Sequence, residues 1–211
     1  MAIIDISLPI FAGMPVYPGT HETGIETVAS PTGTSVVSVM TLTSHAGTHI
    51  DAPIHSLPGT GGIDSYALEK FYGPCRVLDV SKSVGQVSKD DLLDFEIKAG
   101  ERILLKTSNS SRGFKEFYND YVFLGSDAAE YFVEVGVALV GIDSLSIKQR
   151  GSVDQTPHTA LLGNGIAIIE GLDLSNVKLE SYTLLAMPLN VGAIDGSPIR
   201  AVLIEEVVSD D

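Results

Sequence analysis

Short apolar runs separated by turn-forming residues constrain the fold of this chain most. Residues 137–143 (VALVGID) form a near-continuous apolar run, which is typical of a strand covered on both faces of a sheet. Residues 102–107 (RILLKT) have the same buried character, and residues 166–170 (IAIIE) predict a strand that ends in Glu170. We therefore expect a sheet in the interior of an α/β domain.

The remaining elements are predicted from weaker patterns. Ser126 is expected to cap a helix that Gly136 closes, and Ser88 to cap a short helix that runs to about Phe95. Residues 158–163 (HTALLG) predict a single helical turn. Further strands are expected at residues 2–6, 35–43, 75–80, 182–189 and 199–207. The predicted fold is a mixed sheet with few helices that is not a regular βαβ winding.

Charge and length limit the function classes that are compatible with the sequence. The formal net charge of -14 makes nucleic acid and anionic membranes poor partners, since both are bound mainly through basic patches. A chain of 211 residues can bury a full core, so residues 1–211 are expected to form one domain. No run is long and apolar enough for a membrane span, and the opening residues lack the basic stretch of a signal peptide. The single cysteine, Cys75, is expected to be buried and fits a cytoplasmic location.

The chemistry is concentrated in residues 45–55 (HAGTHIDAPIH). His45, His49, Asp51 and His55 all fall at odd positions, so an extended backbone would point their side chains to one side. Imidazoles beside a carboxylate are typical ligands of zinc and similar transition metals. The sequence therefore predicts a metal site on an extended segment.

Two further residues could complete the site. His158 is one of the two histidines outside the cluster, and Glu170 ends an apolar strand that could deliver it to a sheet edge. Each alone would be an ordinary structural or surface residue. The other histidine, His21, is expected at the surface.

Three more polar residues lie outside this cluster. Asp143 could orient a ligand histidine or form a turn, Asp195 is expected in a plain turn, and Arg200 is expected to be structural or at an interface.

The run HAGTHIDAPIH resembles the HxGTHxDxPxH signature of the cyclase family of metal-dependent hydrolases, which includes bacterial kynurenine formamidase and isatin hydrolase. The similarity extends over nearly the whole chain, through DISLPIFAGMPVYPG, VGIDSLSI, HTALLGNGIAIIE and GSPIRAVLIE. The resemblance implies a swivelling β/β/α domain. It also implies a homodimer or homotetramer with sites near the subunit interface.

Carried over to this sequence, the resemblance implies two divalent metal ions, most often Zn²⁺, with Mn²⁺ as the alternative. His45 and His49 would hold the first ion and Asp51 would bridge the two. His158 and Glu170 would hold the second ion.

The same resemblance implies roles for two residues outside the ligand set. His55 would be the acid/base group, and Tyr17 would line the substrate pocket, at a position where formamidases carry a tryptophan. The implied reaction is hydrolysis of N-formylkynurenine to kynurenine and formate by a metal-activated water. A cyclic amide of the isatin type, or another small amide or ester, is an open alternative. A non-catalytic metal-binding module is the alternative from another class.

Overall fold

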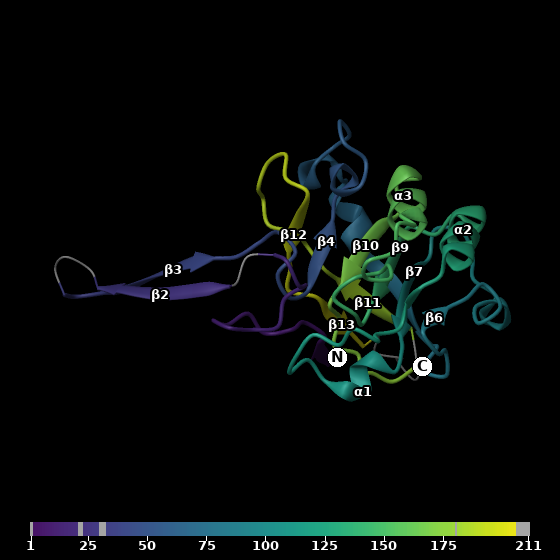
Figure 1. Ribbon diagram of the computed structural model, residues 1–211, viewed down its shortest axis with the longest axis horizontal. Coiled ribbons are helices and arrows are strands. Elements are labelled where there is room, and N and C mark those ends of the chain that lie inside the picture. Colours follow the sequence, from purple (N-terminus) through teal and green to yellow (C-terminus); the bar gives the residue numbers. More distant parts are fainter. Residues whose placement is uncertain (1, 21–22, 30–32, 180, 206–211) are drawn as a thin grey trace, which may run out of the picture.

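A curled sheet of nine strands forms the centre of the protein (Figure 1). The computed structural model describes residues 2–20, 23–29, 33–179 and 181–205. The strand order is β1-β13-β11-β5-β7-β9-β10-β4-β12. The strands are β1 Ile3–Asp5, β4 His49–Asp51, β5 Tyr72–Asp79, β7 Arg102–Lys106, β9 Leu139–Ile142, β10 Ala167–Glu170, β11 Ser181–Leu185, β12 Gly196–Pro198 and β13 Val202–Ile204.

The central strands β5, β7, β9 and β10 are parallel, and the strands on either side of them pair antiparallel. The described residues contain three α-helices, α1 Asn109–Arg112, α2 Ser126–Val135 and α3 Thr156–Gly163. Short 3-10 helices lie at Pro53–His55, Ile63–Ser65, Leu68–Phe71 and Leu93–Phe95. The expected α/β class, with a mixed sheet and few helices, is confirmed.

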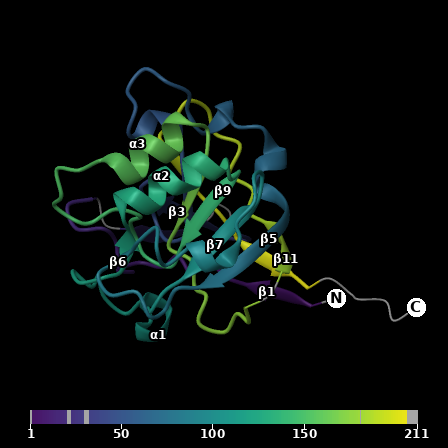
Figure 2. The same cartoon turned by 90° about the vertical axis from the view of Figure 1, so that its right-hand side faces the viewer.

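Apolar residues cover both faces of the sheet, as the run at residues 137–143 predicts. In β7, Leu104 packs into one buried cluster while Ile103 and Leu105 pack into the other, because successive side chains point to opposite faces. Phe132 of α2 belongs to the second cluster, and α2 and α3 lie together over that face (Figure 2). Tyr182 of β11 belongs to the first cluster.

Two small sheets lie outside the main one. β6 Gln86–Val87 pairs with β8 Phe123–Leu124, and β2 Gly24–Ala29 pairs with β3 Val36–Thr41. The β2–β3 hairpin, which we call the arm, projects away from the rest of the molecule (Figure 1). The strand predicted at residues 35–43 is therefore present, but it lies in the arm and not in the main sheet.

The helix expected after Ser88 is absent. The residues after Ser88 form only a turn, stabilised by the Asp91 carboxylate, and then the short 3-10 helix at Leu93–Phe95. The backbone turns left-handed at Glu96, with φ 48°, so a regular helix does not continue.

α2 and α3 also differ in detail from the prediction. Gly125 is the N-cap of α2, while Ser126 is its first residue and its hydroxyl donates to the Asp154 carboxylate. Gly136 closes α2 in the left-handed conformation, as predicted. α3 is longer than the single turn expected, with eight residues. In the part of the chain that the structure describes, every helix is too short or too polar to cross a membrane.

Candidate metal centre

The register of β4 with its neighbour brings a histidine and a glutamate to the same face of the sheet. His49 lies opposite Glu170 in the antiparallel pair of β4 and β10. Along β4, His49 and Asp51 share one face, and Ile50 between them points into the apolar core. Glu170 therefore reaches the site because β10 ends beside the first residue of β4.

The cluster at residues 45–55 converges as expected, but only its centre is extended. His45 precedes β4 in a turn, and His55 follows it in the 3-10 helix that begins at Pro53. The imidazole rings of His45 and His49 lie 4.9 Å apart, and those of His45 and His55 lie 4.2 Å apart. The expectation of one extended segment is thus wrong outside β4, because turns on both sides bring the outer histidines back.

A close backbone approach at the end of β10 helps to form the site. Gly171 has φ 70°, and a Cβ atom there would lie 2.5 Å from the Gly47 carbonyl oxygen. Only glycine fits this position, since the space and the left-handed backbone both exclude a side chain. The turn that carries His45 consequently packs directly on the residue after Glu170.

We call His49, Asp51, His158 and Glu170 the deep set, because all four are at most 4% exposed. His158 lies in the first part of α3, and its Nε2 is 3.4 Å from Asp51 Oδ2 and 3.3 Å from Glu170 Oε1. His49 Nε2 is 3.5 Å from Asp51 Oδ1 and 3.3 Å from Glu170 Oε2. Two imidazoles and two carboxylates therefore face a common centre.

We call His45, His55 and Asp195 the outer set, which lies nearer to solvent. His45 Nδ1 is 2.9 Å from Asp51 Oδ1, and its Nε2 is 3.0 Å from Asp195 Oδ2. His55 Nδ1 is 3.8 Å from the same Asp195 oxygen. By these distances His49 groups with His158 and not with His45. Asp51 lies between the two sets.

The deep set contains buried polar atoms whose hydrogen-bonding capacity is unmet. His49 Nε2 and both carboxylate oxygens of Asp51 make no hydrogen bond. His49 Nδ1 lies 2.9 Å from the Gly47 carbonyl oxygen, an acceptor, so the lone pair of Nε2 faces the two carboxylates. Lone pairs buried face to face are costly unless a cation lies between them.

The donors fit a divalent metal ion. Each imidazole Nε2 in the deep set lies 3.3–3.5 Å from one oxygen of each carboxylate, close enough for a metal ion to bind a nitrogen and a carboxylate oxygen together. His49, Asp51 and Glu170 form one group that could hold a metal, and His45, Asp51 and His55 form another. The expected ligand types are thus together, with His55 among them.

Without a cation, protons bound to the histidines balance the negative charge of the carboxylates. Burial opposes protonation of His158, yet the Asp51 and Glu170 carboxylates raise its pKa to about 9. Burial opposes protonation of His45 too, and Asp51 and Asp195 raise its pKa to about 9. The pKa of Glu170 is lowered to about 2, because His158 and His49 outweigh burial and the charge of Asp51. His55 differs, since burial lowers its pKa and neighbouring histidines add to the effect.

Asp143 and Arg200 bond with residues outside the metal centre. Asp143 contacts no histidine: its carboxylate accepts hydrogen bonds from Thr107 and from the Ser110 amide at the start of α1, while burial raises its pKa. These hydrogen bonds join the end of β9 to the residues at the start of α1. Arg200 pairs with Asp5 at the surface.

Cys75 is buried, as expected. The prediction for His21 lies outside the described residues. For Asp195 the expectation of a plain turn is wrong, because its carboxylate lies against His45. No pattern in the sequence indicates that contact, which joins residues 150 positions apart.

Tyr17 belongs to an aromatic wall that sequence reasoning missed. Its ring meets Phe117 edge to face at 5.4 Å, and Phe117 meets Tyr121 at 5.7 Å. Burial raises the pKa of both tyrosines, and the negative charge of Glu170 adds to the rise.

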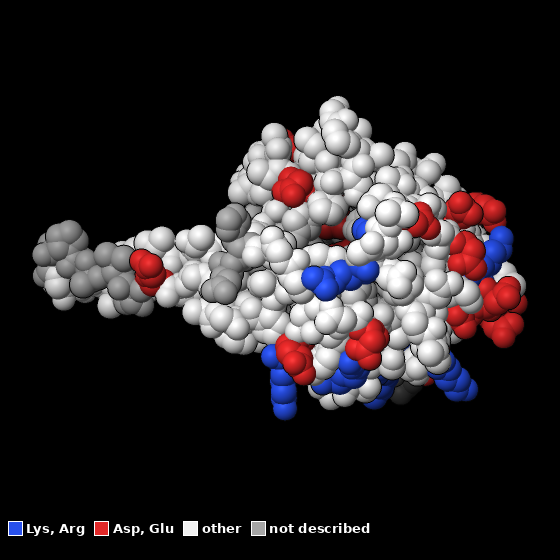
Figure 3. All heavy atoms as spheres, viewed as in Figure 1, with Lys and Arg blue, Asp and Glu red and all other residues white. Residues whose placement is uncertain are grey.

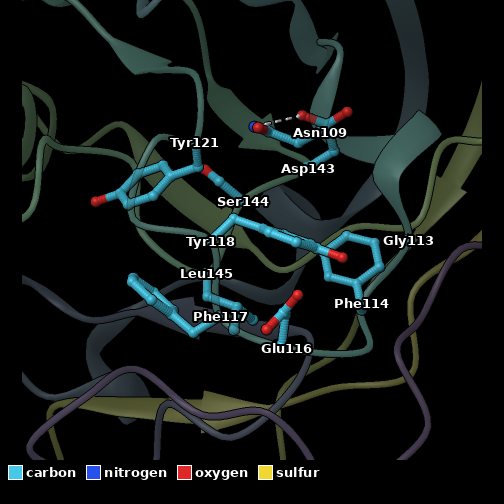
Figure 4. A pocket seen from close by; sticks show the side chains of 10 residues that line it. All are labelled: Asn109, Gly113, Phe114, Glu116, Phe117, Tyr118, Tyr121, Asp143, Ser144 and Leu145. Atoms are coloured by element: carbon cyan, nitrogen blue, oxygen red, sulfur yellow. Dashed lines mark hydrogen bonds between the residues drawn. The ribbon is translucent and has the colours of Figure 1, made fainter.

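Phe117 and Tyr121 also line a pocket, together with Ser144 and Leu145 (Figure 4). The density of aromatic residues between Phe114 and Phe123 is the signal that could have indicated this wall.

Comparison with protein families identifies the chain. The Cyclase family model matches residues 4–149, which is more than half of the sequence and includes the whole cluster at residues 45–55. The chain belongs to the cyclase family. Among relatives, this cyclase-family chain is 35% identical over 206 residues to a kynurenine formamidase of Salinibacter ruber, covering 96% of the chain and 97% of the relative. It is 33% identical to a kynurenine formamidase of Bacillus anthracis, with 95% and 96% covered.

Solved structures agree with this assignment. A protein described as a predicted metal-dependent hydrolase from Bacillus stearothermophilus superposes with a TM-score of 0.86 at 33% identity, covering 96% of this chain and 97% of that one. An isatin hydrolase bound to thioisatinate also superposes with a TM-score of 0.86, covering 97% and 92% of the two chains. At 21% identity, the isatin hydrolase shows a shared fold only.

Proposed function

We propose that this cyclase-family chain is a divalent-metal-dependent amidohydrolase that cleaves N-formylkynurenine to kynurenine and formate. The deep set carries the proposal, because its buried His49 Nε2 and Asp51 carboxylate oxygens, which can bind a metal ion, have no hydrogen-bond partner. The choice of substrate is supported by the near full-length similarity to kynurenine formamidases. Residues 1–211 would act as one catalytic domain.

We assign two cations, with Zn²⁺ as the first choice and Mn²⁺ as the alternative. The deep set would hold one ion, and Asp51 would share its carboxylate with a second ion held by His45. When bound, a divalent cation lowers the pKa of water enough to yield a nucleophile at neutral pH and polarises the carbonyl under attack. The family resemblance implies that His49 and His45 share one ion. Here His49 is assigned to the same ion as His158 and Glu170.

His55 is proposed as the group that moves the proton. Its side chain is 31% exposed, so a substrate could reach this member of the outer set from solvent. Attack of water on the formyl carbon adds an oxygen, and the C–N bond then breaks. The neutral His55 imidazole would accept the proton that the attacking water releases and return it to the departing amine. Asp195, near His55 Nδ1, would keep the ring oriented during this transfer.

The aromatic wall would bind the aryl part of the substrate. Tyr17 and Phe117 present ring edges and faces to each other, an arrangement that a further aromatic ring can join. Tyr17 is smaller than the tryptophan that formamidases carry at this position, and Phe117 would supply the missing aromatic surface. An aryl group held there would place its formamide toward the deep set, since the charge of Glu170 acts on both tyrosines of the wall.

The arm supports a homodimer. Val36, Val39 and Met40 on β3 are 72%, 49% and 63% exposed, and residues 33–41 contain no charged side chain (Figure 3). A two-stranded ribbon with so much exposed apolar area is marginally stable in water by itself.

An open apolar groove beside the base of the arm could receive the arm of a second copy. Its lining includes Leu8, Leu185 and Ile199, as well as Met40 of the arm. A two-fold axis near the arm would bring each arm over the other groove, which is the self-complementary contact of a symmetric dimer. We further propose a cytoplasmic location, consistent with a single buried cysteine.

A comparison of substrates tests the proposed reaction. The metal-loaded protein is incubated with N-formylkynurenine, with isatin and with an aliphatic formamide at equal concentrations, and product release is followed. The proposal expects the highest kcat/KM for N-formylkynurenine. A preference for isatin would instead assign cyclic amide hydrolysis. No turnover of any of the three would favour a non-catalytic metal-binding module.

A further inference from the structure

Asp195 makes contacts that a simple surface turn does not require. Its Oδ2 is 3.0 Å from His45 Nε2, and its Oδ1 accepts a hydrogen bond of 2.8 Å from the Ser44 hydroxyl. Both carboxylate oxygens are therefore used, one on each of two consecutive residues before β4. Asp195 itself lies just before β12, whose Gly196 pairs with Asp51.

The loop that carries Asp195 is held by bonds on both sides. The Asp195 carbonyl accepts a hydrogen bond from the Ala52 amide, and the Ile194 carbonyl accepts one from Ile63. The Ala193 amide donates to the Asp64 carboxylate, and Ala193 has a left-handed backbone with φ 51°. An alanine in this conformation is strained, and the surrounding bonds must hold it in place.

The imidazole of His45 is confined as well. A Cβ atom at Gly196 would lie 3.1 Å from His45 Cε1 and 2.7 Å from the Ile50 carbonyl oxygen, so the ring packs against bare backbone. Carboxylates lie against both ring nitrogens of His45, so a cation beside Asp51 would displace the proton from Nδ1 while Asp195 keeps the proton on Nε2. Nδ1, which is 2.9 Å from Asp51 Oδ1, would then direct its lone pair to that cation.

We infer that Asp195 is a positioning residue for the second cation: it fixes the tautomer and the orientation of His45 so that Nδ1 is the ligand atom. The inference rests on the proposed function, since it requires a cation shared between Asp51 and His45. Carboxylates that hold a ligand histidine in this way increase metal affinity by roughly 10–100-fold. Of the two cations, Asp195 would affect only the one that His45 holds, because its carboxylate bonds with Ser44 and His45 and not with the deep set.

Metal titration tests the inference without using activity. Metal-free wild type, Asp195→Ala, Asp195→Asn and Ser44→Ala are titrated with Zn²⁺ against a chelating dye to count sites and rank their affinities. Co²⁺ absorption spectra report the ligand geometry of each variant. For the weaker site, we expect a loss of roughly 10–100-fold in Asp195→Ala. Asp195→Asn should lose less, since its amide oxygen still accepts from His45 Nε2, and Ser44→Ala least.

The controls separate this inference from the proposed function. Asp79→Asn removes a carboxylate that accepts from the Ser81 amide in a turn outside the site, and it should bind both ions as wild type does. Failure of the wild type to bind Zn²⁺ would contradict the proposed function itself. Wild-type affinity at both sites in Asp195→Ala would overturn the positioning role alone. If Asp195→Ala does not fold, unchanged affinities in Asp195→Asn and Ser44→Ala together overturn it.

Discussion

Glu170 lies opposite His49 in the ladder between β10 and β4, and Oε2 of Glu170 is 3.3 Å from Nε2 of His49. This pair joins the two sequence segments that carry the chemistry, which are 121 positions apart by residue number (170 minus 49). Since both side chains are buried and His49 Nε2 has no hydrogen bond, the register of one strand pair creates a place for a cation.

Replacing His55 separates the two roles that its position allows. His55→Ala should retain both metal ions but lose turnover by roughly 10²–10⁴-fold, because the leaving amine then lacks its proton donor. Metal content per chain and kcat are measured on the same sample. His45→Ala is the matched control and should lose one ion. Loss of an ion in His55→Ala would make it a ligand instead.

The stability of the metal-free protein should depend on pH in a defined direction. The pKa of His45 and of His158 is about 9 in the folded chain, against 6.5 for an ordinary histidine. The folded state therefore binds more protons than the unfolded state between these values, so stability is full below pH 6.5 and is lost as pH rises through 9.

At the acid end the sign reverses. The pKa of Glu170 is lowered from 4.5 to about 2, so its contribution is present above pH 4.5 and is lost as the pH falls toward 2. Melting temperatures of the metal-free protein should fall from pH 6.5 to 9, and Zn²⁺ should remove much of that decline by replacing the protons. A flat profile without metal would contradict the charge balance described for the cluster.

The aromatic wall predicts a selective effect on substrate binding. Phe117→Ala removes the ring that meets Tyr17 and opens the pocket wall. An aromatic contact contributes about 0.5–1.5 kcal/mol, so KM for N-formylkynurenine should rise about 2- to 12-fold. An aliphatic formamide is the control substrate, and its KM should not change. Equal changes for the two substrates would place the aryl group elsewhere.

The arm predicts a change of assembly on substitution. Val36→Ser, Val39→Ser and Met40→Ser together should shift a dimer toward monomer, because the apolar area that would be covered by the second copy is reduced. Sedimentation over a range of protein concentrations measures the shift. Val153→Ser is the matched control, since this residue is 97% exposed and lies outside the arm. A wild type that is monomeric throughout would contradict the proposed dimer.

Much of the fold and the ligand types could be predicted from local pattern. The apolar run before Glu170 predicts a strand that ends in a carboxylate, and β10 ends at that residue. The alternation of His49 and Asp51 predicts a shared face, and β4 provides it. These predictions succeed because the periodicity of a strand directs side chains over a few residues without help from the rest of the chain.

The missed features depend on distant contacts. Asp195 reaches His45 only because β12 adds to the edge of β4, and the sequence around Asp195 resembles an ordinary turn. Phe117 lies in a loop, and its position beside Tyr17 is set by tertiary packing. The strand at Val36–Thr41 was predicted correctly as a strand. Its exposed location follows from its partner, because it pairs with β2 in the arm and not with a strand of the main sheet.

Metal content and amide hydrolysis, measured together, test the central claim most directly. Purified protein is assayed with N-formylkynurenine as prepared, after complete chelation, and after return of Zn²⁺, with metal quantified at each stage. The deep set predicts that activity is lost with the metal and is restored by Zn²⁺ in proportion to occupancy. Equal activity in the chelated, metal-free sample would contradict a metal-dependent reaction at His49, Asp51, His158 and Glu170.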